Sequence, residues 1–256
     1  MTSRLRILVV AGLVGGDEVA LARGAQLRDE TGGELVVLAA RHVAENAERH
    51  LLALGADAGT MIERLDTLSA GDVARFAAHA KAGLVVLPGM ARAGLPFSHP
   101  PLEALEHALH CPLLVAKARR PQAYRRVLVG VHHDARCALS MALAIAPIAH
   151  FTLLRVKSFP GGYVPDTLPE IPPDDEVAAF LGNLVLPHRQ HRWLVRAGKP
   201  KAELLFTAHE EKADLVVMGN THRIGLERAL LGNIALEAAE TLTCDVLIAH
   251  AKDRHP

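Results

Sequence analysis

One segment near the carboxyl end of the chain combines residues whose types and spacing suit the binding of an anion. The apolar run Leu215–Gly219 ends in glycine, and Gly232 with Asn233 stands where a helix is expected to begin. A glycine-containing loop between a strand and a helix leaves backbone N–H groups free to face an anion, most often a phosphate. His222 and Arg223 fall inside this loop. The segment predicts a phosphate site; the alternative is a loop and helix cap that serve the fold alone.

The elements that must position this loop occur twice along the chain. Three pairs of segments match in the same order: Arg6–Val10 with Arg126–Gly130, Ala82–Gly89 with Ala213–Gly219, and Cys111–Lys117 with Cys244–His250. Repeats of this length are whole domains rather than the short units of a solenoid. The seam lies near Ala118–Tyr124, so we predict one domain over residues 1–120 and a second over 121–256.

Each half alternates short apolar runs with longer helix-forming segments. In the first half the strand-like runs are Ile7–Ala11, Leu35–Ala39, Met61–Leu65, Leu84–Leu87 and Leu113–Ala116. Helices are expected over Asp17–Thr31, Ala44–Leu54 and Ser69–Ala80, with Asp17 and Ser69 as N-caps. Continuous apolar strands indicate a sheet that is covered on both faces, and the alternation indicates a doubly wound parallel sheet.

Ligands of such sheets bind beyond the carboxyl ends of the strands, at the point where the strand order reverses. In the second half, those ends are expected at the loops after Val131, Val156 and Gly219. A proline-rich segment, 158–175, follows Val156 and has no counterpart in the first half. Its composition is typical of a loop, which lies either over the site as a lid or on the surface.

Composition narrows the classes of function. The chain has 256 residues, half of them apolar but only 4% aromatic, which suits helices packed on a parallel sheet. Lys and Arg together number 28, as do Asp and Glu, so the formal net charge is zero. The sequence therefore lacks the excess of positive charge that is typical of proteins that bind nucleic acid or an anionic membrane. The three cysteines are scattered, as in a reducing compartment. With no apolar run near the length of a membrane span, we expect a soluble, cytoplasmic protein.

In the order and spacing of these motifs, the chain resembles the universal stress protein family in its tandem, two-domain form. The motifs are Val195–Pro200, Ala213–Gly219, Gly232 with Asn233, and the run from Cys244 to Ile248. The resemblance implies a five-stranded, Rossmann-like sheet in each domain, of the adenine nucleotide alpha hydrolase-like type, and a pairing of the two domains as in a dimer. Some members of the family bind ATP through a G-x2-G-x9-G-[ST] loop and an Asp after the first strand.

The second half matches that binding pattern in part. Gly219 fits the first glycine and Gly232 the third, while His222 replaces the second glycine. A side chain at 222 adds a Cβ where the backbone would approach a phosphate. Asn233 replaces the Ser or Thr but still offers a hydrogen-bonding side chain at a helix start, and His132 stands where the Asp is expected. Arg223 remains available to a phosphate.

The first half departs further from the pattern. Gly89 fits the first glycine, but Arg92 follows in place of the second, and Pro100 removes an N–H donor near the position of the third. After the first strand there is no acid until Asp17. We therefore expect ATP, where it binds at all, in the second domain only.

Other chemistry finds little support. His107, His110 and Cys111 lack a fourth metal ligand, Gly198-Lys199-Pro200 is not a Walker A motif, and no nucleophile with a base and an orienting group can be assembled. The prediction is a stress-response or regulatory module with no catalytic residues and no metal, which binds unknown protein partners and forms either a monomeric pseudo-dimer or a further homodimer. The alternatives are a protein-interaction module without nucleotide, a nucleotide hydrolase or transferase, and a binder of a lipid or cyclic nucleotide.

Overall fold

The computed structural model describes residues 4–13, 15–55, 60–89, 100–131, 135–157, 191–220 and 234–250. The elements of the first half are β1 (Arg6–Ala11), α1 (Asp17–Thr31), β2 (Glu34–Ala40), α2 (Arg41–Ala53), β3 (Met61–Leu65), α3 (Ala70–His79), β4 (Leu84–Pro88), α4 (Pro100–Ala108) and β5 (Leu113–Ala116). Those of the second half are β6 (Arg126–Gly130), α5 (Ala135–Ile145), β7 (His150–Lys157), β8 (His191–Ala197), α7 (Pro200–Glu210), β9 (Leu215–Asn220), α9 (Ile234–Thr241) and β10 (Asp245–His250).

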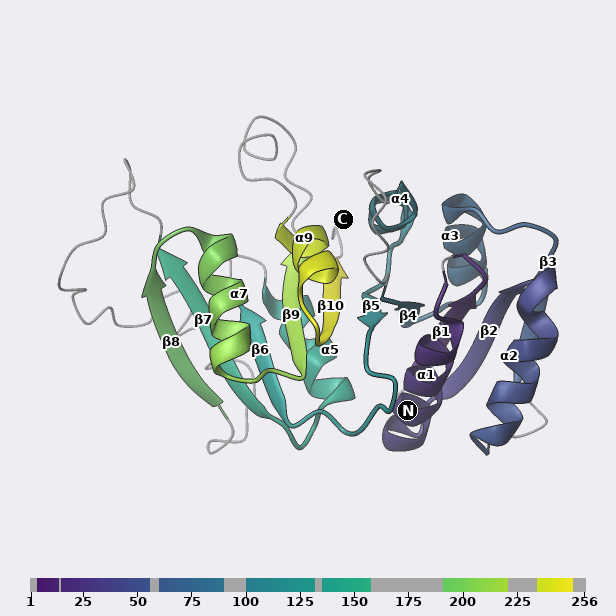
Figure 1. Cartoon of the computed structure of the whole chain (residues 1–256), viewed down its shortest axis with the longest axis horizontal. Coiled ribbons are helices and arrows are strands. Elements are labelled where there is room, and N and C mark those ends of the chain that lie inside the picture. Colours follow the sequence, from purple (N-terminus) through teal and green to yellow (C-terminus); the bar gives the residue numbers. More distant parts are fainter. Residues whose placement is uncertain are drawn as a thin grey trace.

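All the strands join in one ten-stranded sheet, in the order β3-β2-β1-β4-β5-β10-β9-β6-β7-β8. Within each half the strands are parallel, and the halves meet where β5 pairs antiparallel with β10. Figure 1 shows the first half and the second half side by side, with β5 and β10 adjoining in the middle. The predicted fold of two α/β units packed as a pseudo-dimer is confirmed, and the structure adds that the sheet runs through both. The domain bounds at residue 120 remain a prediction.

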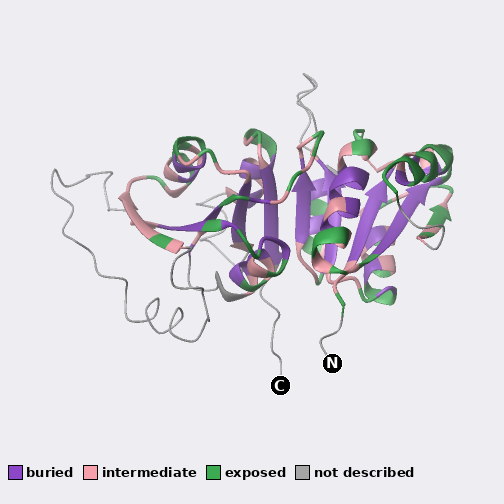
Figure 2. Ribbon diagram, turned by 90° about the horizontal axis from the view of Figure 1, so that it is seen from below, coloured by how far each residue is buried: buried purple, intermediate pink, exposed green. Residues whose placement is uncertain are grey.

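The inner strands of the sheet are buried because apolar side chains cover both of their faces, whereas the edge strands β3 and β8 are exposed or half-buried. In β1, Ile7 and Val9 face one layer and Leu8 and Val10 the other, and all four are 0% exposed. Helices α1, α2 and α5 supply buried residues to the first layer, and α3, α4, α7 and α9 to the second. Figure 2 shows this buried sheet lying between its helices. A sheet enclosed in this way leaves the ends of its strands as the places where a ligand meets the chain.

The N-termini of three helices can be compared with the caps and bounds predicted from the sequence. Ser69 caps α3 as predicted: its hydroxyl accepts from the Asp72 N–H, and the Asp72 carboxylate accepts from the Ser69 N–H. Asp17 is not an N-cap, because Gly16 takes that position with a φ of 94° and Asp17 is the first residue of α1. Helix α2 begins at Arg41, earlier than the predicted Ala44, since β2 runs into it without a loop.

Candidate functional site

The strand order reverses between β6 and β9 in the second half. From β6 the chain moves outward through β7 to β8, then returns to β9 and β10 on the other side. Connections that leave neighbouring parallel strands in opposite directions open a crevice at the carboxyl ends of those strands. The second half therefore has a topological switch point between the end of β6 and the end of β9.

Three residues singled out from the sequence lie at this end of the sheet. Val131 directly follows β6 and donates its N–H to the Leu154 carbonyl of β7 at 2.8 Å. Val156 is near the end of β7, and Gly219 is near the end of β9. The fold thus brings Val131, Val156 and Gly219 to one edge of the sheet, as the parallel arrangement predicts. Their role toward a ligand stays a prediction.

The remaining predicted site residues lie outside the described residues: His132, His222, Arg223, Gly232 and Asn233, together with segment 158–175. One neighbouring feature is described. Helix α9 begins at Ile234, immediately after Asn233, so a helix does start where the Gly-Asn pair predicts one. A helix N-terminus placed after a loop of this kind is a suitable position for an anion.

The equivalent edge of the first half is occupied by its own carboxylate. Asp17 accepts a hydrogen bond of 2.9 Å from the N–H of Gly12, which follows β1. Gly12 has a φ of 87°, and a Cβ there would lie 2.7 Å from Cβ of Ala40 and from Cγ2 of Val43. Burial raises the pKa of Asp17, and the Gly12 amide opposes that rise. In the first half, the backbone amide that follows β1 is therefore already satisfied by a carboxylate of the same half.

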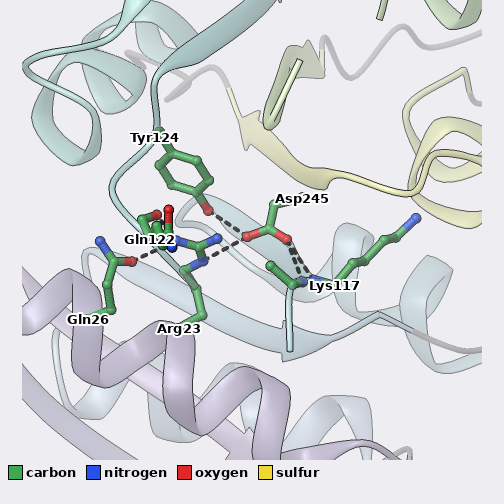
Figure 3. Close-up of polar contacts among 7 residues, drawn as sticks. Arg23, Gln26, Lys117, Gln122, Tyr124 and Asp245 are labelled. Atoms are coloured by element: carbon green, nitrogen blue, oxygen red, sulfur yellow. Dashed lines mark hydrogen bonds and ion pairs between the residues drawn. The ribbon is translucent and has the colours of Figure 1, made fainter. Parts of the chain in front are cut away.

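A buried polar cluster, which the sequence analysis did not single out, joins the two halves (Figure 3). At its centre, Asp245 at the start of β10 is 1% exposed. Its Oδ1 accepts from the backbone N–H groups of Lys117 and Ala118 at 2.7 and 3.2 Å. Its Oδ2 accepts from the Tyr124 hydroxyl at 2.7 Å and lies 2.7 Å from Nε of Arg23 in α1. One carboxylate of the second half thus contacts the first half and the connecting segment.

Arg23 extends this cluster into the first half. The arginine is 2% exposed, and its guanidinium carbon lies 4.2 Å from the centre of the Tyr124 ring. One terminal nitrogen donates to the Gln122 carbonyl at 2.9 Å and to Oε1 of Gln26 at 2.7 Å. The Nε–H does not point along its contact with Asp245, so that contact is an ion pair rather than a hydrogen bond. Burial, followed by the nearby Asp245 charge, raises the pKa of Tyr124 and keeps its hydroxyl a donor.

A sequence signal for this cluster existed. In the repeated run, Asp245 of the second half stands where the first half has Pro112, so an acid interrupts an otherwise apolar strand on one side only. An unmatched charge in a buried strand indicates a buried partner. Beside it, Lys117 donates from Nζ to the Leu242 carbonyl at the end of α9, and burial raises the pKa of the Cys244 thiol to about 11. These groups lie at the junction between the two halves rather than at the carboxyl ends of the strands in the second half.

No group of metal ligands is found in the described part of the chain. No three His, Cys, Asp or Glu side chains in it lie close enough together to hold a metal ion. Cys137 in α5 is half-buried. None of the described helices is long and apolar enough to cross a membrane.

The doubly wound sheet with its strand-end switch point defines a Rossmann-like α/β protein. A model of the universal stress protein family matches residues 123–250, which is half of the chain. The chain belongs to the universal stress protein family. A universal stress protein of Methanocaldococcus jannaschii is 45% identical over 51 residues, and this match spans 20% of the present chain and 30% of that relative's length.

Two solved structures share the fold over nearly the whole chain. A functionally unknown protein from Pseudomonas aeruginosa superposes with a TM-score of 0.70 at 21% identity, covering 97% of this chain and 93% of its own. A universal stress protein from Archaeoglobus fulgidus superposes with a TM-score of 0.68 at 13% identity, covering 96% and 98%. In both comparisons the superposition extends over both halves of the chain.

Proposed function

We propose that the protein is a tandem universal stress protein of the cytoplasm, a regulatory module that binds ATP in its second half only. The observation that carries this proposal is the position of three strand ends. The segments after Val131, Val156 and Gly219 leave neighbouring parallel strands beside the reversal of strand order between β6 and β9. This is where α/β sheets bind nucleotides, and α9 begins directly after the Gly-Asn pair.

The first half serves in this proposal as a structural partner. Asp17 already accepts a hydrogen bond from the Gly12 amide at the end of β1, and a side chain at Gly12 would clash with Ala40 and Val43. Helix α4 begins at Pro100, which has no N–H to offer a phosphate. We therefore assign one nucleotide to each chain and a protein-binding role to the first half.

Calorimetric titration of Mg-ATP into the full-length protein tests the proposal. We expect saturable binding of one nucleotide per chain, which Gly232→Trp abolishes because the indole fills the turn that faces the phosphates. His222→Gly should tighten binding, since it restores the glycine that the family pattern places there. Absence of heat with nucleotide in large excess, or binding that Gly232→Trp leaves intact, would refute a nucleotide site in this loop.

A further inference from the structure

The two halves repeat one corner of the fold at the amino ends of their strands, opposite to the proposed nucleotide site. Arg6 opens β1 and Arg126 opens β6. Each guanidinium donates to a backbone carbonyl just beyond a helix, Arg6 to Ala80 at 2.6 Å and Arg126 to Lys212 at 2.9 Å. The chain turns there in the same way, with φ of 52° at Lys81 and 49° at Lys212. This arrangement of an arginine at a strand start and a turn after a helix is therefore repeated, and we call it the corner. A substitution in one copy can be compared directly with the same substitution in the other.

The copies differ in the residue beside the arginine. In the first half the neighbour in register on β2 is Glu34, whose carboxylate pairs with the Arg6 guanidinium at 2.7 Å. In the second half the neighbour in register on β7 is His150. The Arg126 side chain has no carboxylate partner among the described side chains, and Asp214 bonds instead to the backbone N–H groups of Arg125 and Arg126. The second half thus lacks the acid on the neighbouring strand that pairs with the arginine side chain, and its own carboxylate here, Asp214 in place of Gly83, binds the backbone instead.

A pocket of about 380 Å³ opens at the corner of the second half, at the amino ends of β6, β7 and β8. Its polar lining comprises Arg126, His150, Thr152, His191, Arg192 and Glu211, and the rest of its wall is apolar. Arg126 is in register with His150, and Thr152 with Arg192, and side chains in register on neighbouring strands point to the same face of a sheet. By the same registers, the first half has Val36 and Met61 in place of Thr152 and Arg192.

The charges of the pocket leave one cation uncompensated. Arg192 pairs closely with Glu211, and its Nε donates to the hydroxyl of the buried Thr152 at 3.3 Å, so the one carboxylate among the described lining residues is already engaged. The Arg126 guanidinium has no carboxylate partner among the described side chains, and His150 stands next to it as a further donor.

We propose that this amino-end pocket binds a small organic anion, with its oxyanion head on Arg126 and His150 and its apolar body against the wall of the pocket. A guanidinium presents paired N–H groups that match a carboxylate. The volume lies within the range of about 300–1,000 Å³ that is typical of small-molecule sites. Because the pocket is at the opposite end of the sheet from the switch point, this inference is independent of ATP binding.

Sodium benzoate is the probe, titrated into ¹⁵N-labelled full-length protein and followed by amide chemical shifts. We expect saturable shifts at the amino ends of β6, β7 and β8. Benzyl alcohol, a neutral molecule of similar shape, should bind at least about tenfold more weakly, because it offers no charge to Arg126. Inorganic phosphate, which has no apolar body, should also bind more weakly than benzoate. Equal binding of benzoate and benzyl alcohol, equal binding of benzoate and phosphate, or no shift at these amides overturns the proposal.

The repeated corner supplies matched variants. Arg126→Gln should weaken benzoate at least about tenfold, while Arg6→Gln, the same change in the first half, should leave affinity unchanged. His150→Glu recreates the acid of the first half, and we expect it to abolish binding by neutralising Arg126 in a chain that keeps its fold. Retained affinity in His150→Glu overturns the proposal even where Arg126→Gln fails to fold. Equal losses in the Arg6 and Arg126 variants would mean that benzoate binds elsewhere.

Discussion

At the scale of the residue, Asp245 determines how the halves are held together. Its carboxylate is buried, yet it has the Arg23 guanidinium, the Tyr124 hydroxyl and two backbone N–H groups around it. A buried ion pair is weak support for stability as a whole, but removing one partner leaves the other charge buried and unpaired. The two partners come from different halves, so their loss acts on the junction.

Asp245→Ala should therefore lower the free energy of unfolding by about 3–5 kcal/mol, because Arg23 stays 2% exposed without its counter-charge. Tyr124→Phe removes one hydrogen bond to the carboxylate and should cost less, about 1.5–3 kcal/mol. Urea denaturation followed by circular dichroism measures both. The double variant Arg23→Met with Asp245→Leu should be more stable than Asp245→Ala alone. The single variants Arg23→Met and Asp245→Leu each leave one charge unpaired. If the double variant loses as much free energy of unfolding as these two single variants added together, the unpaired charge plays no role.

At the scale of the element, the packing of α1 on β1 depends on the absence of a side chain at Gly24. A Cβ at this position would lie 2.3 Å from Cγ2 of Val9 and 3.2 Å from Cδ1 of Leu35. Helix α1 is buried along this side, with Leu21, Ala25 and Leu27 at most 3% exposed. The glycine is therefore a packing requirement in the middle of a helix, where its intrinsic propensity is unfavourable.

Gly24→Ala should destabilise the protein, since an overpacked contact costs about 1–3 kcal/mol and exceeds the roughly 1 kcal/mol that alanine adds to a helix. Gly71→Ala is the matched control, because the nearest atom to its Cβ is the Ser69 hydroxyl at 3.7 Å, and it should be neutral or stabilising. Denaturation midpoints measured side by side give the comparison. Stabilisation by both substitutions would show that α1 can move away from β1 without cost.

The elements also show what the sequence predicts and where prediction ends. Every strand-like run of the first half forms a strand. Four of these runs are uninterrupted and apolar, and such runs have few other ways to be buried. The fifth, Met61–Leu65, contains two charged residues and forms the exposed edge strand β3. Helix α1 has the predicted bounds Asp17–Thr31, but its N-cap is Gly16 rather than Asp17, in a left-handed conformation that composition does not reveal. At the candidate site, the parallel pattern predicts that Val131, Val156 and Gly219 share an edge. The Arg23–Asp245 contact was missed, because it joins residues far apart in the chain that only the paired sheet brings together.

At the scale of the whole molecule, the antiparallel pairing of β5 with β10 makes one sheet from two parallel ones. Val115 pairs with Val246 and Leu114 with Leu247 across this junction. These residues are at most 2% exposed in the intact chain. A separated half would present an apolar strand edge, which is a template for pairing with another chain. The repeated sequence offers two alternatives, pairing with the other half or pairing with a second copy of itself.

The buried cluster should decide between these alternatives in favour of the unlike pair. Expressed separately, residues 1–120 and 121–256 should each dimerise or aggregate, and mixing them should yield a 1:1 complex. Only the unlike pair brings Arg23 to Asp245, because Pro112 takes the repeated position of Asp245 in the first half. Sedimentation velocity on the mixture measures the species present. Arg23→Met in the first fragment should shift the mixture toward like pairs; a monodisperse, monomeric second fragment, or an unlike pair that forms equally well with Arg23→Met, would show that this cluster does not select the partner.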